Sequence, residues 1–246
     1  MKAIILAAGR GSRMGALTDD RPKGLAKLGG LTLISRAIQS LRAGGCTSIG
    51  IATGYRAELV AHLGDHAFHN AAWTQTNMVM TLAAARDWLT AEPVIISYSD
   101  IFYSAQTVAV LAGATAPVAI AYDPHWLALW SHRFADPLSD AETFKRDCDG
   151  YLIEIGHHPV SVADVEGQYM GLIKMTPHGW AEAEAAMCGL TQDRLHRLDM
   201  TSLLSLLLGN GMKVATVAQC GQWGECDSEA DLALYEGWIS QGLLGL

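Results

Sequence analysis

The sequence lacks several features that would place it in common protein classes. Its five cysteines are an odd number and include no CxxC pair, a spacing that suits neither a disulfide framework nor a zinc site. No stretch approaches the roughly 20 consecutive apolar residues of a membrane span. No basic segment precedes an apolar run near Met1, as it would in a signal peptide. We therefore expect a cytoplasmic protein with reduced thiols and no membrane span.

Basic residues are also in the minority. There are 17 Lys and Arg against 25 Asp and Glu, a net charge of −8. Without a dominant basic face, binding to duplex nucleic acid is not expected. A local basic cluster near the N-terminus remains compatible with a phosphate ligand.

No linker divides the chain. Pro/Gly/Ser-rich tethers, charge runs and internal repeats are absent, and 246 residues that are 50% apolar can form a substantial core. We expect one domain over residues 1–246. The apolar tail "ISQGLLGL" either covers the partner of a homo-oligomer or caps the core, and the sequence leaves both open.

Apolar runs alternate with helical patterns along the chain. The expected strands are "KAIILA", "SIGIATG", "PVIISYSD", "PVAIAY", "QYMGLIKM" and "KVATVA". The expected helices are "LTLISRAIQSLRAGG", "YRAELVAHLGD", "MVMTLAAARDWL", "SAQTVAVLAGA", "PHGWAEAEAAM", "MTSLLSLLLGNG" and "SEADLALYEGWIS". Because these strands lack polar alternation, we predict an α/β, Rossmann-like fold with a mostly parallel central sheet flanked by helices. Ligands of such sheets bind beyond the carboxyl ends of the strands.

Residues 123–168 differ from the rest of the chain. This stretch is polar and aromatic, and "FKRDCDGYLIEIG" predicts a small β-hairpin around Asp149-Gly150. We expect an insertion within the single domain.

A glycine-rich turn follows the first strand in "MKAIILAAGRGSRMG". Glycines let backbone amides approach an anion closely. The P-loop pattern GxxxxGK[ST] is absent, and Gly9, Gly11 and Gly15 give GxGxxxG, not the dinucleotide pattern GxGxxG. Taken alone, a plain structural turn explains the stretch equally well.

The segment "RPKGLAKLGG", which begins at Arg21, completes a more specific pattern. "LAAGRGSRM" followed by "PKGL" resembles the opening signature of nucleotidyltransferases with a glycosyltransferase-A-like fold. The resemblance implies that Arg13 and Lys23 hold a triphosphate and act as the catalytic cations. It also implies a nucleotide-binding edge that comprises Leu6, Ala7, Ala8, Gly9, Gly11 and Ser99.

Two aspartates follow distant strands. Asp100 ends "IISYSD" and Asp227 lies in "WGECDSEADL". Carboxylates from two strand ends can converge on one Mg²⁺, which prefers oxygen ligands and retains waters while it joins phosphates. The resemblance implies that both aspartates bind Mg²⁺. Asp227 could instead cap a helix, and Glu225 and Asp231 fit a solvated face better.

These features together describe attack on a nucleotide α-phosphorus with release of pyrophosphate. "TQTNMVMTL", "SYSDIFY", "EGQYMGL" and "WGECDSEADL" look most similar to the choline-phosphate cytidylyltransferase branch, which includes enzymes that activate aminoalkylphosphonates. This similarity implies CTP as donor, with Thr53, Gly54 and Tyr55 near the base. It implies a small acceptor such as phosphocholine or 2-aminoethylphosphonate on the side of residues 123–168.

The expected acceptor-binding residues are Asn77, Trp130, Arg133, Glu142, Tyr169 and Trp223. Aromatic rings attract a quaternary ammonium through their negative faces, but Trp126 and Trp130 at i, i+4 would equally pack as core. Charges of both signs, such as Arg133 and Glu142, suit a zwitterion or a phosphorylated amino acid at least as well.

Three other interpretations stay open. One is a sugar-phosphate nucleotidyltransferase that uses UTP or GTP. A second is a catalytically silent nucleotide-binding module, although Lys23, Asp100 and Asp227 are all present. The third is the molybdenum-cofactor guanylyl branch, whose LAGGxSxRMG loop matches imperfectly here.

Overall fold

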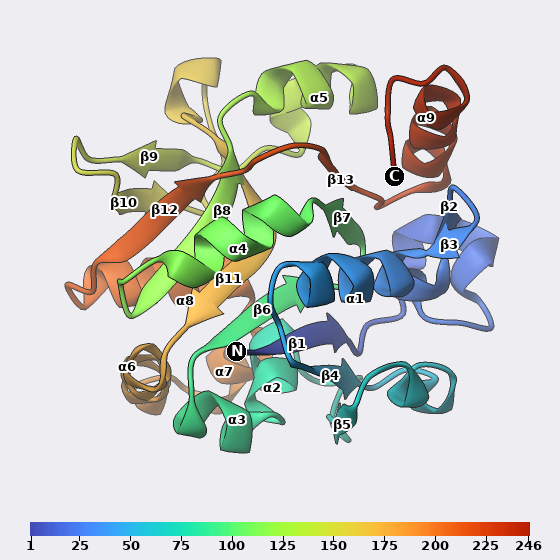
Figure 1. Cartoon of the computed structure of the whole chain (residues 1–246). Helices are drawn as coiled ribbons and strands as arrows, with labels where there is room; N and C mark the ends of the chain where they lie inside the picture. The colour runs from blue at the N-terminus through green and yellow to red at the C-terminus, as the bar shows by residue number, and fades with distance from the viewer.

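A seven-stranded sheet organises the molecule in the computed structural model, which describes residues 1–246. Its strand order is β12-β8-β11-β6-β1-β4-β5 (Figure 1). The strands are β1 (Lys2–Ala7), β4 (Ser48–Thr53), β5 (His66–His69), β6 (Val94–Tyr98), β8 (Val118–Asp123), β11 (Gln168–Met175) and β12 (Val214–Ala218). Only β11 runs antiparallel to its neighbours. The mostly parallel sheet is thus as predicted.

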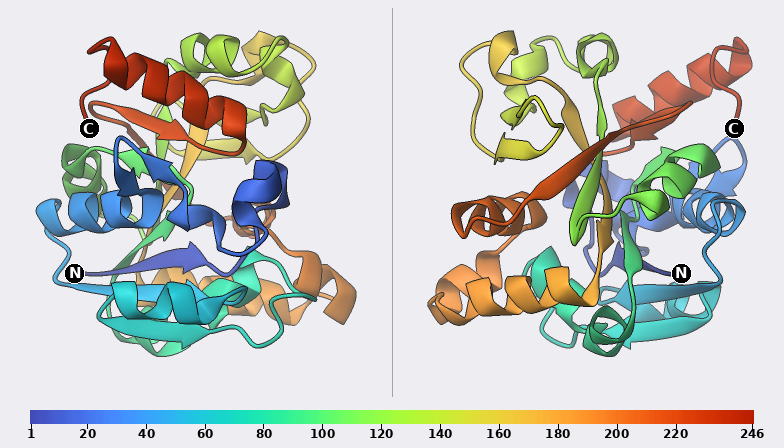
Figure 2. Two further views of the ribbon diagram at one scale, coloured as in Figure 1. Left: turned by 90° about the vertical axis from the view of Figure 1, so that its right-hand side faces the viewer. Right: turned by 60° about the vertical axis from the view of Figure 1, so that its left-hand side comes forward.

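Helices cover both faces of this sheet (Figure 2). One layer holds α1 (Leu33–Ala43) and α4 (Ala105–Gly113), which contact each other. The other layer holds α2 (Met78–Ala83), α3 (Arg86–Ala91), α6 (Pro177–Cys188) and α8 (Met200–Gly209), with α7 (Gln192–Arg197) leading into α8. The central strands β1, β4, β6 and β8 are mostly apolar and buried because helices cover both faces of the sheet there, whereas the edge strand β5 is largely exposed.

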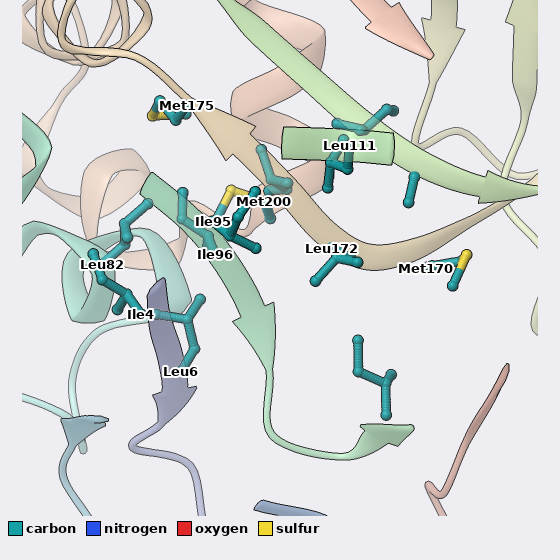
Figure 3. Packing of buried hydrophobic residues seen from close by; sticks show 14 of the residues in the cluster. Ile4, Leu6, Leu82, Ile95, Ile96, Leu111, Met170, Leu172, Met175 and Met200 are labelled. Atoms are coloured by element: carbon teal, nitrogen blue, oxygen red, sulfur yellow. The ribbon is translucent and has the colours of Figure 1, made fainter. Parts of the chain in front are cut away.

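The core between these layers is continuous, with 50 buried residues in one cluster. Leu82 of α2 lies beside Ile4 of β1, and Ile96 of β6 is the register partner of Ile4 in the sheet (Figure 3). Strands β1 and β6 pair directly, from Lys2↔Val94 to Leu6↔Tyr98. Their carboxyl ends therefore lie next to each other.

Smaller elements lie beyond the carboxyl ends of the central strands. They are β2 (Lys27–Leu28), β3 (Leu31–Thr32), β7 (Ile101–Tyr103), α5 (Trp126–Arg133), β9 (Phe144–Arg146), β10 (Leu152–Ile155), β13 (Trp223–Glu225) and α9 (Glu229–Ser240). Strands β9 and β10 pair antiparallel, as the predicted hairpin requires. Strand β13 pairs antiparallel with β7, which brings the segment after β12 back to the end of β6.

A second, smaller core lies under α9. Its eight buried residues are Met14, Leu28, Leu33, Phe102, Cys226, Leu232, Tyr235 and Leu244. In the apolar tail, Leu244 therefore caps this core, whereas Leu243 is 64% exposed and Leu246 48% exposed.

The structure corrects two expected helices. "YRAELVAHLGD" forms two single 3₁₀ turns, Ala57–Leu59 and Ala61–Leu63, because Arg56 adopts a left-handed φ of 47° and Val60 breaks the run at φ −123°. "MVMTLAAARDWL" divides into α2 and α3, since Ala85 leaves the helical region. The remaining 3₁₀ segments are Ser12–Thr18, Lys23–Leu25, Pro137–Ser139 and Val162–Asp164.

None of the helices combines the length and apolar character needed to cross a bilayer. All five cysteines are free thiols.

Candidate active site

Three distant segments meet at the carboxyl ends of β1 and β6. They are the glycine loop after β1, the Ser99-Asp100 pair after β6, and the turn between β13 and α9. The backbone N–H of Cys226 donates to the carbonyl oxygen of Asp100 at 2.9 Å. As a result, carboxylate oxygens of Asp100, Glu225 and Asp227 lie within 4.8 Å of one another. The two expected metal ligands are therefore neighbours, on the same side of the sheet as the glycines.

Lys23 links this acidic cluster to the glycine loop. Its Nζ lies 2.7 Å from Oδ2 of Asp100 and also donates to Oδ1 of Asp227. The side chains of Lys23 and Asp227 are each only 8% exposed. Burial lowers the pKa of Lys23, but the charges of Asp100 and Asp227 outweigh it and raise that pKa above its usual range. Lys23 is thus a permanent cation between the two acids.

Two arginines contact Asp227, each at a different carboxylate oxygen. Arg13 is 67% exposed and places Nη2 3.0 Å from Oδ1 of Asp227. The side chain of Arg133 has no exposed surface; its Nη2 lies 3.4 Å from Oδ2 of the same carboxylate. Burial raises the pKa of Asp227, but Lys23, Arg13 and Arg133 bring it below the usual value, so the group is ionised near neutral pH.

The donors of the cluster fit a divalent cation. Three carboxylates supply only oxygen ligands, which hard ions such as Mg²⁺ prefer. Oδ1 of Asp100 is buried and has no hydrogen-bond partner. A buried acceptor without a partner is costly, and a bound cation would satisfy it.

A cavity of about 220 Å³ adjoins the cluster on the β1 side. Among the residues expected to bind nucleotide, its lining includes Leu6, Ala8, Gly9, Gly11 and Ser99, together with Arg13, Lys23 and Asp100. Gly11 has a φ of +76°, and a Cβ there would lie 2.5 Å from Cβ of Lys23. The loop can therefore approach Lys23 only because residue 11 is glycine.

The other expected nucleotide-binding residues lie behind this cavity. Ala7 is buried in the sheet, and Thr53 is 1% exposed. The Tyr55 hydroxyl donates to the carbonyl of Asp19 at 2.6 Å, while its backbone N–H donates to the carbonyl of Ala8. Gly54 packs against Trp73, so this turn braces the loop and the wall of the cavity.

Sequence reasoning missed part of the lining. Besides Asn77, the remaining lining of the first cavity consists of Trp73, Thr76, Met78, Thr81 and Tyr98. Asn77, expected on the acceptor side, lines it as well. Its Oδ1 accepts from the N–H of Met78 at the start of α2.

A second cavity, of about 340 Å³, lies on the far side of the acidic cluster. It shares Arg13, Met78 and Tyr98 with the first cavity and also contacts Glu225 and Asp227. Its outer wall carries Asp140, Glu142, Gln168, Tyr169 and Asp199. Of the expected acceptor residues, Glu142 and Tyr169 line this cavity, and residues 123–168 contribute to its wall.

Three expected acceptor residues lie elsewhere. Trp130 is fully buried and stacks on Trp223 with ring centroids 5.9 Å apart. The indole N–H of Trp223 donates to Asp123 at 2.8 Å. Both tryptophans belong to the core, which corrects their assignment to the acceptor site and agrees with the alternative that Trp126 and Trp130 pack as core.

Arg133 is the third residue whose expected place in the acceptor site the structure corrects. Its guanidinium lies 4.6 Å from the ring centroid of Trp130. It donates from Nε to Asp231 at 2.8 Å and from Nη1 to Glu225 at 3.2 Å. With its donors committed to these acids, Arg133 holds the acidic cluster and does not face either cavity.

The structure also corrects the expectation that Glu225 and Asp231 lie on a solvated face. Glu225 joins the acidic cluster, where burial and the neighbouring carboxylates of Asp227 and Asp100 raise its pKa. Asp231 is 4% exposed and forms a capping box with Ser228 at the start of α9.

Comparisons with known proteins identify the family of the chain. The family model described as a MobA-like NTP transferase domain matches residues 3–151. The chain is 36% identical to the CTP:phosphoglutamine cytidylyltransferase of Campylobacter jejuni, over 94% of this chain and 98% of that protein. It is 31% identical to the 2-aminoethylphosphonate cytidylyltransferase of Lancefieldella rimae, but over only 42% of this chain and 44% of that protein.

Solved structures show the same fold. A glucose-1-phosphate thymidylyltransferase from Bacillus anthracis superposes with a TM-score of 0.78 at 18% identity, over 100% of this chain and 98% of that one. The inositol-1-phosphate CTP transferase of T. maritima gives 0.74 at 17% identity, over 99% of this chain and 98% of that one. The expected nucleotidyltransferase fold is confirmed.

Proposed function

The chain belongs to the MobA-like NTP transferase family and is a nucleotidyltransferase, and from this premise we propose that it transfers CMP from CTP to a small zwitterionic phosphate or phosphonate, with Mg²⁺ as cofactor. The observation that carries the proposal is the position of the Asp100–Glu225–Asp227 cluster. It lies between a glycine-lined cavity and a second cavity, and Lys23 and Arg13 contact it.

In the proposed reaction, the triphosphate of CTP lies along the backbone of Gly9 and Gly11 in the first cavity. Lys23 and Arg13 hold its negative charge. A phosphate oxygen of the acceptor, in the second cavity, bonds to the α-phosphorus. The bond from that phosphorus to the bridging oxygen of the β-phosphate breaks, and pyrophosphate leaves with both electrons. Mg²⁺, held by Asp100 and Asp227, would neutralise charge on the phosphoryl oxygens.

This reaction needs no general base from the protein. The terminal phosphoryl or phosphonyl group of such an acceptor is already anionic near neutral pH. The role of the chain is to position the two anions against each other and to offset their repulsion.

Phosphoglutamine is the acceptor that we favour. Phosphoglutamine appears in the name of the relative that aligns with almost the whole of this chain. It carries the charges of a phosphorylated amino acid. Phosphocholine is a weaker candidate, because Trp130 and Trp223, the rings expected to hold a quaternary ammonium, are buried in the core. 2-Aminoethylphosphonate shares the primary ammonium and is the second acceptor of the proposal.

The test is a matrix of nucleotides and acceptors with release of pyrophosphate as the readout. CTP, UTP and GTP are each combined with phosphoglutamine, 2-aminoethylphosphonate, phosphocholine and glucose 1-phosphate, with Mg²⁺ or EDTA. We expect turnover with CTP and phosphoglutamine that is at least about 100-fold above that with UTP or GTP, and none in EDTA. Turnover only with a sugar phosphate, or undiminished turnover in EDTA, would refute the proposal.

A further inference from the structure

The outer wall of the second cavity carries a pair of acids without a protein cation. Glu142 comes from residues 123–168, and Asp199 is the N-cap residue of α8. The Thr201 hydroxyl lies 3.4 Å from Oε1 of Glu142 and 3.4 Å from Oδ1 of Asp199, so both carboxylates border one spot. No lysine, arginine or histidine forms an ion pair with either acid.

The charge balance of this cavity is strongly negative. Its lining contains five carboxylates, and Arg13 is its only basic residue. Arg13 lies toward Asp140 and Asp227, at the junction with the first cavity. Burial and the nearby charge of Asp199 raise the pKa of Glu142, so these two acids destabilise each other in the free protein. His157 offsets part of this charge on Glu142, but no lysine or arginine pairs with either acid, so an acceptor cation would be stabilised there.

Other polar atoms in the same wall also lack partners. Oε1 of Gln168 is buried and forms no hydrogen bond, and the buried hydroxyl of Tyr169 has only the side chain of Tyr98 as a near polar neighbour. Both residues line the cavity. A primary ammonium has three N–H donors, which can be shared among carboxylate, amide and hydroxyl oxygens. A quaternary ammonium has none.

We infer that Glu142 and Asp199 determine acceptor specificity by binding a primary ammonium group of the acceptor at the end away from its phosphate. This inference rests on the proposed function and deepens it. The phosphate end lies toward Arg13 and the acidic cluster, and the ammonium end lies against Glu142, Asp199 and the side-chain oxygens of Gln168 and Tyr169.

Direct binding tests the inference separately from turnover. Calorimetry compares two pairs of probes: phosphoglutamine with its N-acetyl derivative, and 2-aminoethylphosphonate with ethylphosphonate. In each pair, the second molecule keeps the phosphorus group of the first but lacks its ammonium charge. We expect the wild-type protein to bind the ammonium-bearing member of at least one pair about 10-fold or more tightly. In Glu142→Gln the two members should bind within about threefold of each other.

Two variants complete the design. Asp199→Asn keeps an oxygen that can cap α8 and should lose discrimination as Glu142→Gln does. Glu154→Gln, on the surface of β10, should retain it, because Glu154 pairs only with Lys145 away from the cavity. For each variant, the affinity for CTP should stay within about twofold, since no carboxylate of this pair lines the first cavity.

The outcomes separate the two proposals. Equal affinity of the wild type for both members of each pair, or no binding of any ammonium-bearing probe, overturns the inference even if CMP transfer occurs. Preserved discrimination in Glu142→Gln and Asp199→Asn overturns it as well. Ammonium-dependent binding without pyrophosphate release from any nucleotide would support the inference and refute the proposed function.

Discussion

At the scale of single residues, Lys23 has the most demanding position. It is nearly buried, it contacts two carboxylates, and it faces the cavity that would hold a triphosphate. Its pairing with Asp100 and Asp227 in the free protein keeps the acids in place. When metal and nucleotide bind, the lysine can exchange these partners for phosphate oxygens.

Replacement of Lys23 by alanine should lower kcat/KM for CTP by about 100- to 1,000-fold. It should also leave two crowded carboxylates without their cation. The melting temperature of Lys23→Ala in EDTA should therefore fall well below that of the wild type. Added Mg²⁺ should raise the melting temperature of the variant more than that of the wild type. Lys27→Ala, at the exposed residue of β2, is the matched control and should alter neither quantity. Equal turnover by Lys23→Ala and the wild type would remove Lys23 from the mechanism.

Arg133 acts through other residues. Its guanidinium is buried and hydrogen-bonded to Glu225, Asp227 and Asp231, so it positions the acidic cluster. Arg133→Met should reduce the free energy of unfolding by about 3 kcal/mol, because buried acids lose their partner. It should also weaken binding of Mn²⁺, measured by electron paramagnetic resonance. Arg133→Lys should recover part of both losses, while exposed Arg194→Met should change stability by less than about 0.5 kcal/mol. Unchanged Mn²⁺ binding by Arg133→Met would contradict the positioning role.

At the scale of elements, the glycine loop combines a left-handed backbone with a close approach to Lys23. Gly11→Ala should strain the turn and displace the lysine, because a Cβ would lie 2.5 Å from its side chain. Gly30→Ala is the control, since Gly30 has a similar φ of +81° but nothing within 4 Å of the added Cβ.

Both alanine variants should lose about 1 to 2 kcal/mol of stability from the left-handed backbone. Only Gly11→Ala should lose turnover, by about 10-fold or more. Chemical denaturation and pyrophosphate release measure the two effects. Comparable loss of turnover in Gly30→Ala would mean that strain, and not the approach to Lys23, limits the loop.

Sequence patterns predicted the elements that depend on local signals. The apolar strands and the hairpin at Asp149-Gly150 are short-range features, and each formed where expected. The expected helix after β4 failed because Arg56 takes a left-handed φ, which its local sequence does not reveal. The antiparallel direction of β11 is likewise a property of the whole sheet.

The network around Arg133 could not be predicted for a related reason. Arg133 is 98 positions from Asp231 and 92 from Glu225 in the chain. Charged residues so far apart look like separate surface groups in a sequence. Only the pairing of β13 with β7 brings Glu225 to the end of β6 and turns these charges inward. The same contact made Trp130 a core residue.

At the scale of the whole molecule, the crowded acids of the second cavity should appear in the pH dependence of stability. Burial raises the pKa of Glu142 above its unfolded value. A carboxyl group with a raised folded pKa destabilises the native state where it is charged, and this cost disappears as the pH falls toward the unfolded pKa of about 4.3.

Glu142→Gln should consequently be more stable than the wild type at pH 8, with a difference that shrinks toward pH 4. Urea denaturation across this range measures the difference. The matched Glu154→Gln variant should show no such trend. A stabilisation by Glu142→Gln that is the same at pH 4 and pH 8 would mean that the charge of Glu142 is already compensated.

The account depends on one spatial arrangement, in which the start of the chain binds a triphosphate beside a divalent ion held by acids from two distant segments. A crystal structure with Mn²⁺ and a CTP analogue that resists α-phosphorus attack tests it most directly, since the anomalous signal of manganese locates the ion. We predict an ion between Asp100 and Asp227 that contacts a phosphate running along Gly9 and Gly11. An ion bound elsewhere, or a triphosphate that does not contact the glycine loop, would contradict the account.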